Sequence, residues 1–167
     1  MLKIRAENGS DAPGIDAVLL ASFPTPAEAQ LVQALRSSKH LSLSLVALWQ
    51  ERIIGHAAWS PVATDAGEHG LGLAPVAVLA AFRRQGIAAQ LIRQGIQTCQ
   101  RAECRWMVVL GNPSYYQRFG FAPASLHELC DTYSGGDAFQ IQALHPTGLP
   151  NPGGTIRYRQ EFSDCGC

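Results

Sequence analysis

One segment, residues 75–92, restricts what this chain can fold into more than any other. It starts with an apolar run that contains a proline, passes through Arg83-Arg84-Gln85-Gly86 and continues with apolar residues at helical spacing. The apolar run predicts a strand over Leu71–Leu79. Pro75 predicts a bulge or a splayed partner there, because proline cannot donate to a strand ladder. A strand, a short loop and an amphipathic helix in this order favour an α/β protein.

The start of that helix is suited to an anion. The first turn of a helix has unpaired N–H groups and the positive end of the helix dipole. Gly86 lacks a Cβ, and Ala88 and Ala89 are nearly as small, so an anion can approach the backbone closely. Arg83 and Arg84 add positive charge. Taken alone, the string is explained equally well as an ordinary loop with two solvated arginines.

The rest of the chain alternates between helical and strand patterns, which predicts one mixed α/β (α+β) sheet in a single domain, 1–167. The final cysteines, Cys165 and Cys167, are expected to form a frayed tail. The other expected elements are helices that start at Ser10-Asp11 and Thr25-Pro26, a hairpin of strands 41–49 and 52–62 with its turn at Gln50-Glu51, a helix 86–100, a strand 106–110, a short helix that ends at Gly120, and strands 139–144 and 155–162.

Composition excludes several classes of protein. The chain has 167 residues, with 13 Lys plus Arg against 13 Asp plus Glu. Zero net charge argues against a protein that coats nucleic acid or an anionic membrane. The longest nearly apolar run, Leu71–Phe82, is far shorter than the ~20 residues of a membrane span, and the N-terminus has no signal-peptide pattern. Five cysteines, an odd number, favour reduced thiols in the cytoplasm, and no His or Cys cluster predicts a metal site.

The charges are unevenly distributed along the chain. Residues 83–118 contain six arginines and a single acid, Glu103. Residues 119–154 contain three acids, Glu128, Asp131 and Asp137, and no Lys or Arg. We therefore expect an anion near the first stretch and a cationic group near the second.

Two blocks of sequence resemble a known family. The first reads Arg83-Arg84-Gln85-Gly86-Ile87-Ala88 and the second reads Tyr116-Gln117-Arg118-Phe119-Gly120-Phe121. They match the patterns Gln/Arg-x-x-Gly-x-Gly/Ala and Tyr-x-Lys/Arg-Leu/Phe-Gly-Phe of the GNAT superfamily of acetyl-CoA-dependent N-acetyltransferases, which this chain resembles. The resemblance implies a GNAT-like mixed, mostly antiparallel central sheet flanked by helices, with a splayed strand pair that binds coenzyme A.

The resemblance also implies which residues bind acetyl-CoA as the cosubstrate. The backbone of residues 83–89 would hold the pyrophosphate, and the strand before it would pair with the pantetheine arm. Asn112 would either contact the pantetheine arm or only cap the short helix that follows it. The residues expected to bind acetyl-CoA are Val76, Val78, Arg83, Arg84, Gln85, Gly86, Ile87, Ala88, Ala89 and Asn112.

Membership of this family implies direct attack of an amine on the acetyl thioester within a ternary complex. The backbone N–H of Val78 is the candidate donor to the oxyanion. Tyr116 matches the position of the acid that protonates the departing thiolate, and Tyr115 is the adjacent alternative. The general base is open: the candidates are His56, Glu28, Glu68 and His69, with a relay through water as the alternative.

The acceptor would be a primary amine of a small molecule or of a protein, since no motif identifies it. The main alternative function is a non-catalytic module of GNAT-like fold that binds an acyl-CoA as a sensor or partner. A more distant alternative is an ATP-binding phosphotransferase. The oligomeric state is also open, with a homodimer as one alternative.

Overall fold

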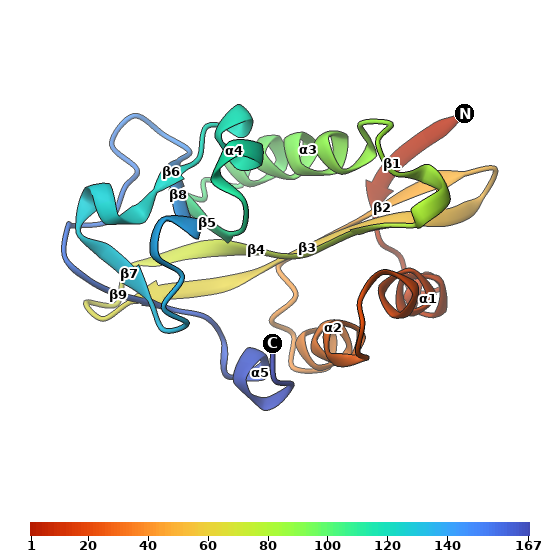
Figure 1. Cartoon of the computed structure of the whole chain (residues 1–167), viewed down its shortest axis with the longest axis horizontal. Helices are drawn as coiled ribbons and strands as arrows, with labels where there is room; N and C mark the ends of the chain where they lie inside the picture. The colour runs from red at the N-terminus through yellow and green to blue at the C-terminus, as the bar shows by residue number, and fades with distance from the viewer. The chain divides into compact units, whose positions relative to one another are not determined.

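The computed structural model describes residues 1–167 (Figure 1), and the chain divides into two compact units. The first unit contains residues 1–59, 75–95 and 160–167, and the second contains residues 60–74 and 96–159. The long strands β3 (Arg52–Thr64) and β4 (His69–Val78), and the helix α3 (Ile87–Arg101), contribute residues to both units.

The first unit is built on an antiparallel meander. Strand β1 (Leu2–Ala6) pairs with β2 (Leu43–Trp49), and β2 pairs with β3. The β2–β3 connection is the predicted two-residue turn, and its residues Gln50 and Glu51 have φ of 50° and 64°. Two positive φ angles match the twist of a tight hairpin. The hairpin prediction is therefore confirmed.

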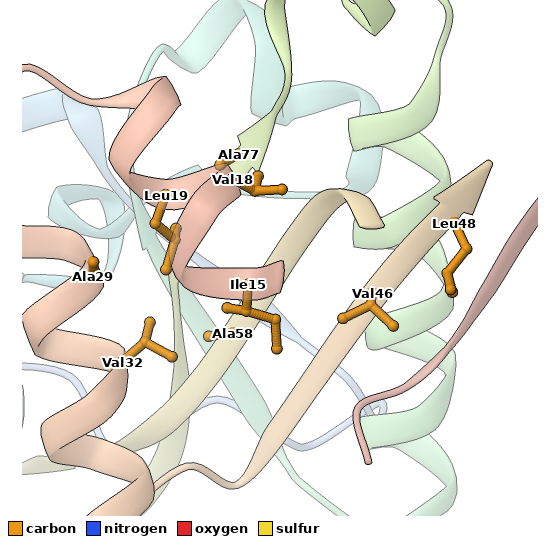
Figure 2. Close-up of a cluster of buried hydrophobic side chains, with 9 residues drawn as sticks. All are labelled: Ile15, Val18, Leu19, Ala29, Val32, Val46, Leu48, Ala58 and Ala77. Atoms are coloured by element: carbon orange, nitrogen blue, oxygen red, sulfur yellow. The ribbon is translucent and has the colours of Figure 1, made fainter. Parts of the chain in front are cut away.

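Two helices cover one face of this meander. They are α1 (Ala12–Ser22) and α2 (Ala27–Ser37), which start within two residues of the predicted Ser10-Asp11 and Thr25-Pro26 caps. Figure 2 shows their apolar side chains turned toward alternate residues of the strands. This core consists of Ile15, Val18, Leu19, Ala29, Val32, Val46, Leu48, Ala58 and Ala77.

The C-terminal segment of the chain corrects two expectations. The strand predicted over 155–162 is wrong in its second half: β9 (Gly154–Arg157) ends early, and α5 (Gln160–Asp164) follows. Glu161 of α5 accepts a hydrogen bond from Ser38 Oγ at 3.0 Å, and its Oε2 lies 2.9 Å from His40 Nδ1. These contacts to the end of α2 are long-range, so local alternation could not predict them.

The tail after α5 is ordered rather than frayed. The N–H of Cys165 donates to the carbonyl of Glu161, and the N–H of Cys167 donates to the carbonyl of Phe162. Gly166 has a φ of 75°, which allows the chain to close back on the end of the helix.

The second unit contains mixed strand pairs. Strand β4 pairs in parallel with β5 (Trp106–Leu110), which has the predicted bounds, and β5 pairs antiparallel with β8 (Phe139–Ala143). Three short pairings complete it: β6 (Ala122–Pro123) with β8, β9 with the end of β3, and β7 (Leu129–Asp131) with β9. Strands of two or three residues carry too little alternation to predict, so β6 and β7 were missed.

The predicted class is confirmed: the sheet is mixed and mostly antiparallel, and it is flanked by helices. Two pairings are parallel, β4 with β5 and β7 with β9. A second core, in the second unit, contains Val62, Trp106, Val108, Ala124, Leu129, Phe139, Ile141 and Ile156. None of the helices has the length and apolar character that a transmembrane helix requires.

Candidate functional site

The β4–β5 ladder ends just before Pro75. The paired residues are Leu71–Leu73 of β4 and Met107–Val109 of β5, although β4 itself continues to Val78. A proline removes a ladder donor, so pairing is expected to fail near it. The interruption predicted from the sequence is confirmed for this ladder.

In the first unit, two hydrogen bonds anchor the loop after β4, and residues 83–86 of the loop are exposed to solvent. The N–H of Leu79 donates to the carbonyl of Ile54 at 2.8 Å, and Arg83 Nε donates to the carbonyl of Val78 at 2.8 Å. Residues 83–86 are all exposed, whereas Ile87 is buried. The Arg83 side chain therefore pins the loop to the end of the strand rather than extending freely into solvent.

The backbone of this loop has a conformation that L side chains disfavour. Arg84 has a φ of 62° and Gly86 a φ of 77°, and a Cβ at Gly86 would meet no atom within 4 Å. The N–H of Gln90 donates to the carbonyl of Gly86, so α3 starts directly after the glycine. The N–H groups of the first turn have no helical carbonyl to bond. Together these features leave several donors open to an anion.

A hollow of about 350 Å³ lies beside the loop, and the sequence analysis did not predict it. Its lining is mainly apolar and comes from the ends of the β1–β2 pair as well as from the loop. The lining residues are Leu2, Trp49, Ala81, Phe82, Gln85 and Ile87.

The second expected block lies in the second unit, where β5 runs into α4 (Pro113–Tyr116). Asn112 Oδ1 accepts the N–H of Ser114 at 2.9 Å and so caps α4. A 3₁₀ turn over residues 117–119 follows, and Gly120 ends it with a φ of 97°. The predicted short helix that ends at Gly120 is confirmed, and of the two roles considered for Asn112 the structure shows the cap.

Tyr116 is held by aromatic packing. Its ring lies against Gly111, where a Cβ would stand 2.5 Å from Tyr116 Cε2. It makes edge contacts with Tyr115 at 5.1 Å and with Phe121 at 6.0 Å between ring centres. Burial, and to a smaller extent Tyr115, raise the pKa of Tyr116 to about 12. The phenol is therefore protonated at neutral pH and available as a donor.

The four candidate bases are divided between the two units, with Glu28 and His56 in the first and Glu68 and His69 in the second. His56 is fully buried on β3, its Nε2 is 2.8 Å from Ser44 Oγ, and burial, followed by the charge of Arg36, lowers its pKa to about 3. Glu68 accepts the N–H of Asn151, and His69 is exposed at the start of β4. Glu28 lies in the first turn of α2.

Residues 13–121 match the sequence model of the acetyltransferase (GNAT) family, which is more than half of the chain. This chain belongs to the GNAT family. The resemblance identified from the two sequence blocks is thereby confirmed, because the matched span contains the loop at Gly86 and the segment that ends at Phe121.

Relatives of this GNAT protein cover nearly its whole length. It is 40% identical over 163 residues to the protein named uncharacterized N-acetyltransferase YhbS of Escherichia coli K12, covering 96% of this chain and 98% of that relative. The crystal structure of E. coli YhbS in complex with CoA matches with a TM-score of 0.93 and 39% identity, over 97% of this chain and 92% of that chain.

A second solved structure is a GNAT family acetyltransferase from Brucella melitensis in complex with acetyl-CoA. It matches with a TM-score of 0.81 and 36% identity, over 97% of this chain and 98% of that chain. The GNAT fold expected from the sequence is therefore confirmed at the level of the whole chain.

Proposed function

We propose that this protein transfers the acetyl group of acetyl-CoA to a primary amine by direct attack within a ternary complex. The observation that carries the proposal is the exposed turn at Arg84–Gly86, which opens donor groups at the start of α3. This turn occurs in a chain that is 36% identical to a GNAT acetyltransferase whose structure holds acetyl-CoA.

The proposed cosubstrate site uses the residues singled out in the sequence. The backbone from Arg83 to Ala89 would bind the pyrophosphate, with the charge of Arg84 adding to the attraction. The β4 edge beyond its ladder with β5, at Val76 and Val78, would pair with the amides of the pantetheine arm, as an added strand pairs with a sheet edge, although the carbonyl of Val78 already accepts from Arg83. Asn112 is assigned a supporting role, because its side chain already caps α4.

The proposed reaction is a direct transfer that uses neither a metal nor a covalent enzyme intermediate. The amine nitrogen attacks the thioester carbonyl carbon, the C–S bond breaks, and the products are an amide and the thiol of coenzyme A. The backbone N–H of Val78 would donate to the oxyanion. The amine must lose one proton, and the thiolate must gain one.

Tyr116 is assigned to the thiolate. Its pKa of about 12 exceeds the ~8.5 of an ordinary thiol, so complete proton transfer would be uphill by roughly 5 kcal/mol. Tyr116 would therefore stabilise the departing thiolate by a hydrogen bond, and solvent would complete the protonation. Tyr115, the adjacent alternative, serves as the control when this role of Tyr116 is tested by substitution.

We assign no side chain as the general base. A buried imidazole with a pKa of about 3 is a poor proton acceptor, which argues against His56. Glu68 is already bonded to the backbone of Asn151. Proton release through water is the proposed route.

The proposal covers residues 1–167 as a single acetyltransferase domain that works in the cytoplasm. The five cysteines are all free, which fits a reducing compartment. The acceptor is a small-molecule or protein amine.

Thiol release from acetyl-CoA, measured across a panel of primary amines, tests this function. We expect release that depends on the amine and that requires a higher acetyl-CoA concentration when Gly86 is replaced by valine. Tight acetyl-CoA binding with no release for any amine would overturn catalysis and leave a CoA-binding module. Nucleotide binding that acetyl-CoA does not displace would instead indicate a phosphotransferase.

A further inference from the structure

A second hollow in the first unit is lined by residues that the proposed acetyl-CoA site does not use. It has a volume of about 300 Å³ and is formed where the end of β1, the end of α2 and the start of β2 meet. Its charged side chains are Glu7, Arg36 and Lys39, and Ser44 of β2 also lines it. This hollow is called the α2 pocket below. It shares no lining residue with the hollow beside the Gly86 loop, so it is a separate candidate site.

The α2 pocket carries one uncompensated positive charge. Glu7 is neutralised by Arg36, because its Oε2 accepts from Arg36 Nε at 3.0 Å and its Oε1 accepts from Arg36 Nη2 at 3.4 Å. Lys39 is exposed and forms no ion pair with an acidic side chain. The charge of Lys39 favours an anion, and the Glu7 carboxylate disfavours a second negative charge. The pocket is therefore suited to a monoanion.

Ser44 connects the α2 pocket to a buried histidine. Its Oγ lies 2.8 Å from His56 Nε2, and His56 Nδ1 has no hydrogen-bond partner. Ser44 is 6% exposed and His56 is fully buried. Burial, followed by the charge of Arg36, lowers the pKa of His56 to about 3. The imidazole is therefore neutral at pH 7 and carries a proton on only one of its two nitrogens.

The neutral imidazole can bond Ser44 in two ways. If Nε2 accepts from the Ser44 hydroxyl, the only ring N–H is at Nδ1, where it is buried without a partner. If Nε2–H donates to Ser44 Oγ, the ring N–H is satisfied and the hydroxyl hydrogen is free to donate to an acceptor in the pocket. A buried donor without an acceptor is costly, so an anion in the pocket stabilises the second arrangement.

Apolar surface lies beside these polar groups. Leu41 and Leu43 also line the α2 pocket, and both are only partly buried. A ligand that covers them removes apolar surface from water. A volume of about 300 Å³ is at the small end of ligand pockets, which limits the ligand to a few carbon atoms beyond its charged group.

We propose that the α2 pocket binds a small monocarboxylate with a short aliphatic body. The carboxylate accepts from the Lys39 ammonium and the Ser44 hydroxyl, beside the guanidinium of Arg36. The aliphatic body covers Leu41 and Leu43. This binding uses none of the residues assigned to acetyl transfer, so it stands or fails independently of that function.

NMR titration of the full chain with butyrate and with its neutral analogue butyramide tests the proposal. We expect butyrate to bind about ten-fold more tightly, because the amide forms no charge-assisted contact with Lys39. The ring signals of His56, identified by their absence in His56→Gln, should shift as butyrate is added. Those of His69, in the second unit, should stay in place.

Substitutions separate the contribution of each group. Lys39→Glu reverses the uncompensated charge and should remove the preference for butyrate over butyramide. Lys3→Glu, at an exposed lysine of β1 that does not line the pocket, is the matched control and should retain the preference. Ser44→Ala should weaken butyrate binding by about five-fold. Lys39→Glu changes an exposed side chain, so it provides the test if Ser44→Ala does not fold.

Four results would overturn the proposal. They are equal affinity for butyrate and butyramide, a preference that survives Lys39→Glu, butyrate binding without a shift of the His56 signals, and inorganic phosphate that binds as tightly as butyrate. The last would show that the aliphatic body contributes nothing. Absence of thiol release from acetyl-CoA with every amine would instead overturn the proposed acetyl transfer and leave the butyrate result unchanged.

Discussion

The loop around Gly86 and the turn around Gly111 need glycine for different reasons. At Gly86 a Cβ would meet nothing within 4 Å, and glycine is needed only for its φ of 77°. At Gly111 a Cβ would press on the Tyr116 ring at 2.5 Å, and glycine is needed because space is lacking. The first site is an open backbone conformation, and the second is a packed aromatic cluster.

This difference predicts how each site responds to an amino-acid substitution. An open turn depends on its own dihedral angles, so a side chain there alters the direction of its N–H groups and little else. A packed tyrosine depends on its neighbours, so changes beside it act through its position. Backbone changes in the loop should therefore affect acetyl-CoA binding, and packing changes around Tyr116 should affect turnover.

The largest effect is expected when the Tyr116 hydroxyl is removed. Tyr116→Phe keeps the ring contacts but removes the donor to the thiolate, so kcat should fall by about 10²- to 10³-fold. The dissociation constant for acetyl-CoA should change less than about two-fold, since the phenol is not assigned to binding. Steady-state thiol release and calorimetry measure the two quantities. Tyr115→Phe is the matched control, and an equal loss of kcat in that variant would contradict the assignment.

Gly86→Val should act on binding. Valine at a positive φ costs about 1–2 kcal/mol locally and turns the N–H groups away from the phosphates. Loss of two charge-assisted hydrogen bonds would raise the acetyl-CoA dissociation constant by roughly 30- to 100-fold. Gly67→Val is the matched control, because Gly67 has a φ of 84° and is equally uncrowded. Unchanged binding in Gly86→Val, measured by calorimetry, would count against the pyrophosphate site.

Gly111→Ala adds a single methyl group beside the Tyr116 ring and tests whether packing there controls turnover. The new Cβ would displace the Tyr116 ring, so we expect a loss of about 1–3 kcal/mol in unfolding free energy and about ten-fold in kcat. Acetyl-CoA affinity should be nearly unchanged. Gly9→Ala, where a Cβ meets nothing, is the control. Equal kinetics in both variants would show that Tyr116 is not positioned through Gly111.

The smallest expected effect is the pH dependence of stability that comes from the buried His56 in the first unit. Folded His56 has a pKa of about 3, whereas in the unfolded chain it takes up a proton near its ordinary value of 6.5. Between these values the unfolded state binds more protons, so stability falls as the pH falls, by up to about 1.4 kcal/mol per pH unit. The lowered pKa values of Glu161 and Asp11 act only below their ordinary values of 4.5 and 3.8. The window from pH 6.5 to 4.5 therefore isolates His56.

Urea unfolding at pH 6.5 and pH 5 measures this dependence. His56→Gln should flatten it, whereas His69→Gln, at an exposed histidine, should leave it unchanged. The same slope in wild type and His56→Gln would show that His56 is not held neutral in the folded protein.

The sequence predicted strongly patterned elements better than weakly patterned ones. The strand 106–110 has the predicted bounds, and α3 starts one residue after the predicted position. The short strands β6 and β7 exist only because other strands pair with them. The helix α5 replaced a predicted strand because Glu161 meets Ser38 and His40, which are more than a hundred residues away in sequence.

The candidate site residues also divide into those located by local sequence pattern and those whose state depends on packing. The family pattern located the loop from Arg83 to Ala89 and the tyrosine at 116, because glycine conformation and motif spacing are local properties of the chain. Sequence could not show that His56 is fully buried or that Arg83 bonds the carbonyl of Val78. Each of those facts depends on which segments pack together.

The sequence by itself therefore determined the family, the sheet class and the place of the open turn, because periodicity, proline and glycine act through nearby backbone. Tertiary structure alone decided which tyrosine is packed against Gly111 and which histidine is kept neutral. Burial and aromatic contact are properties of segments brought together by folding, and no local pattern in the chain specifies them.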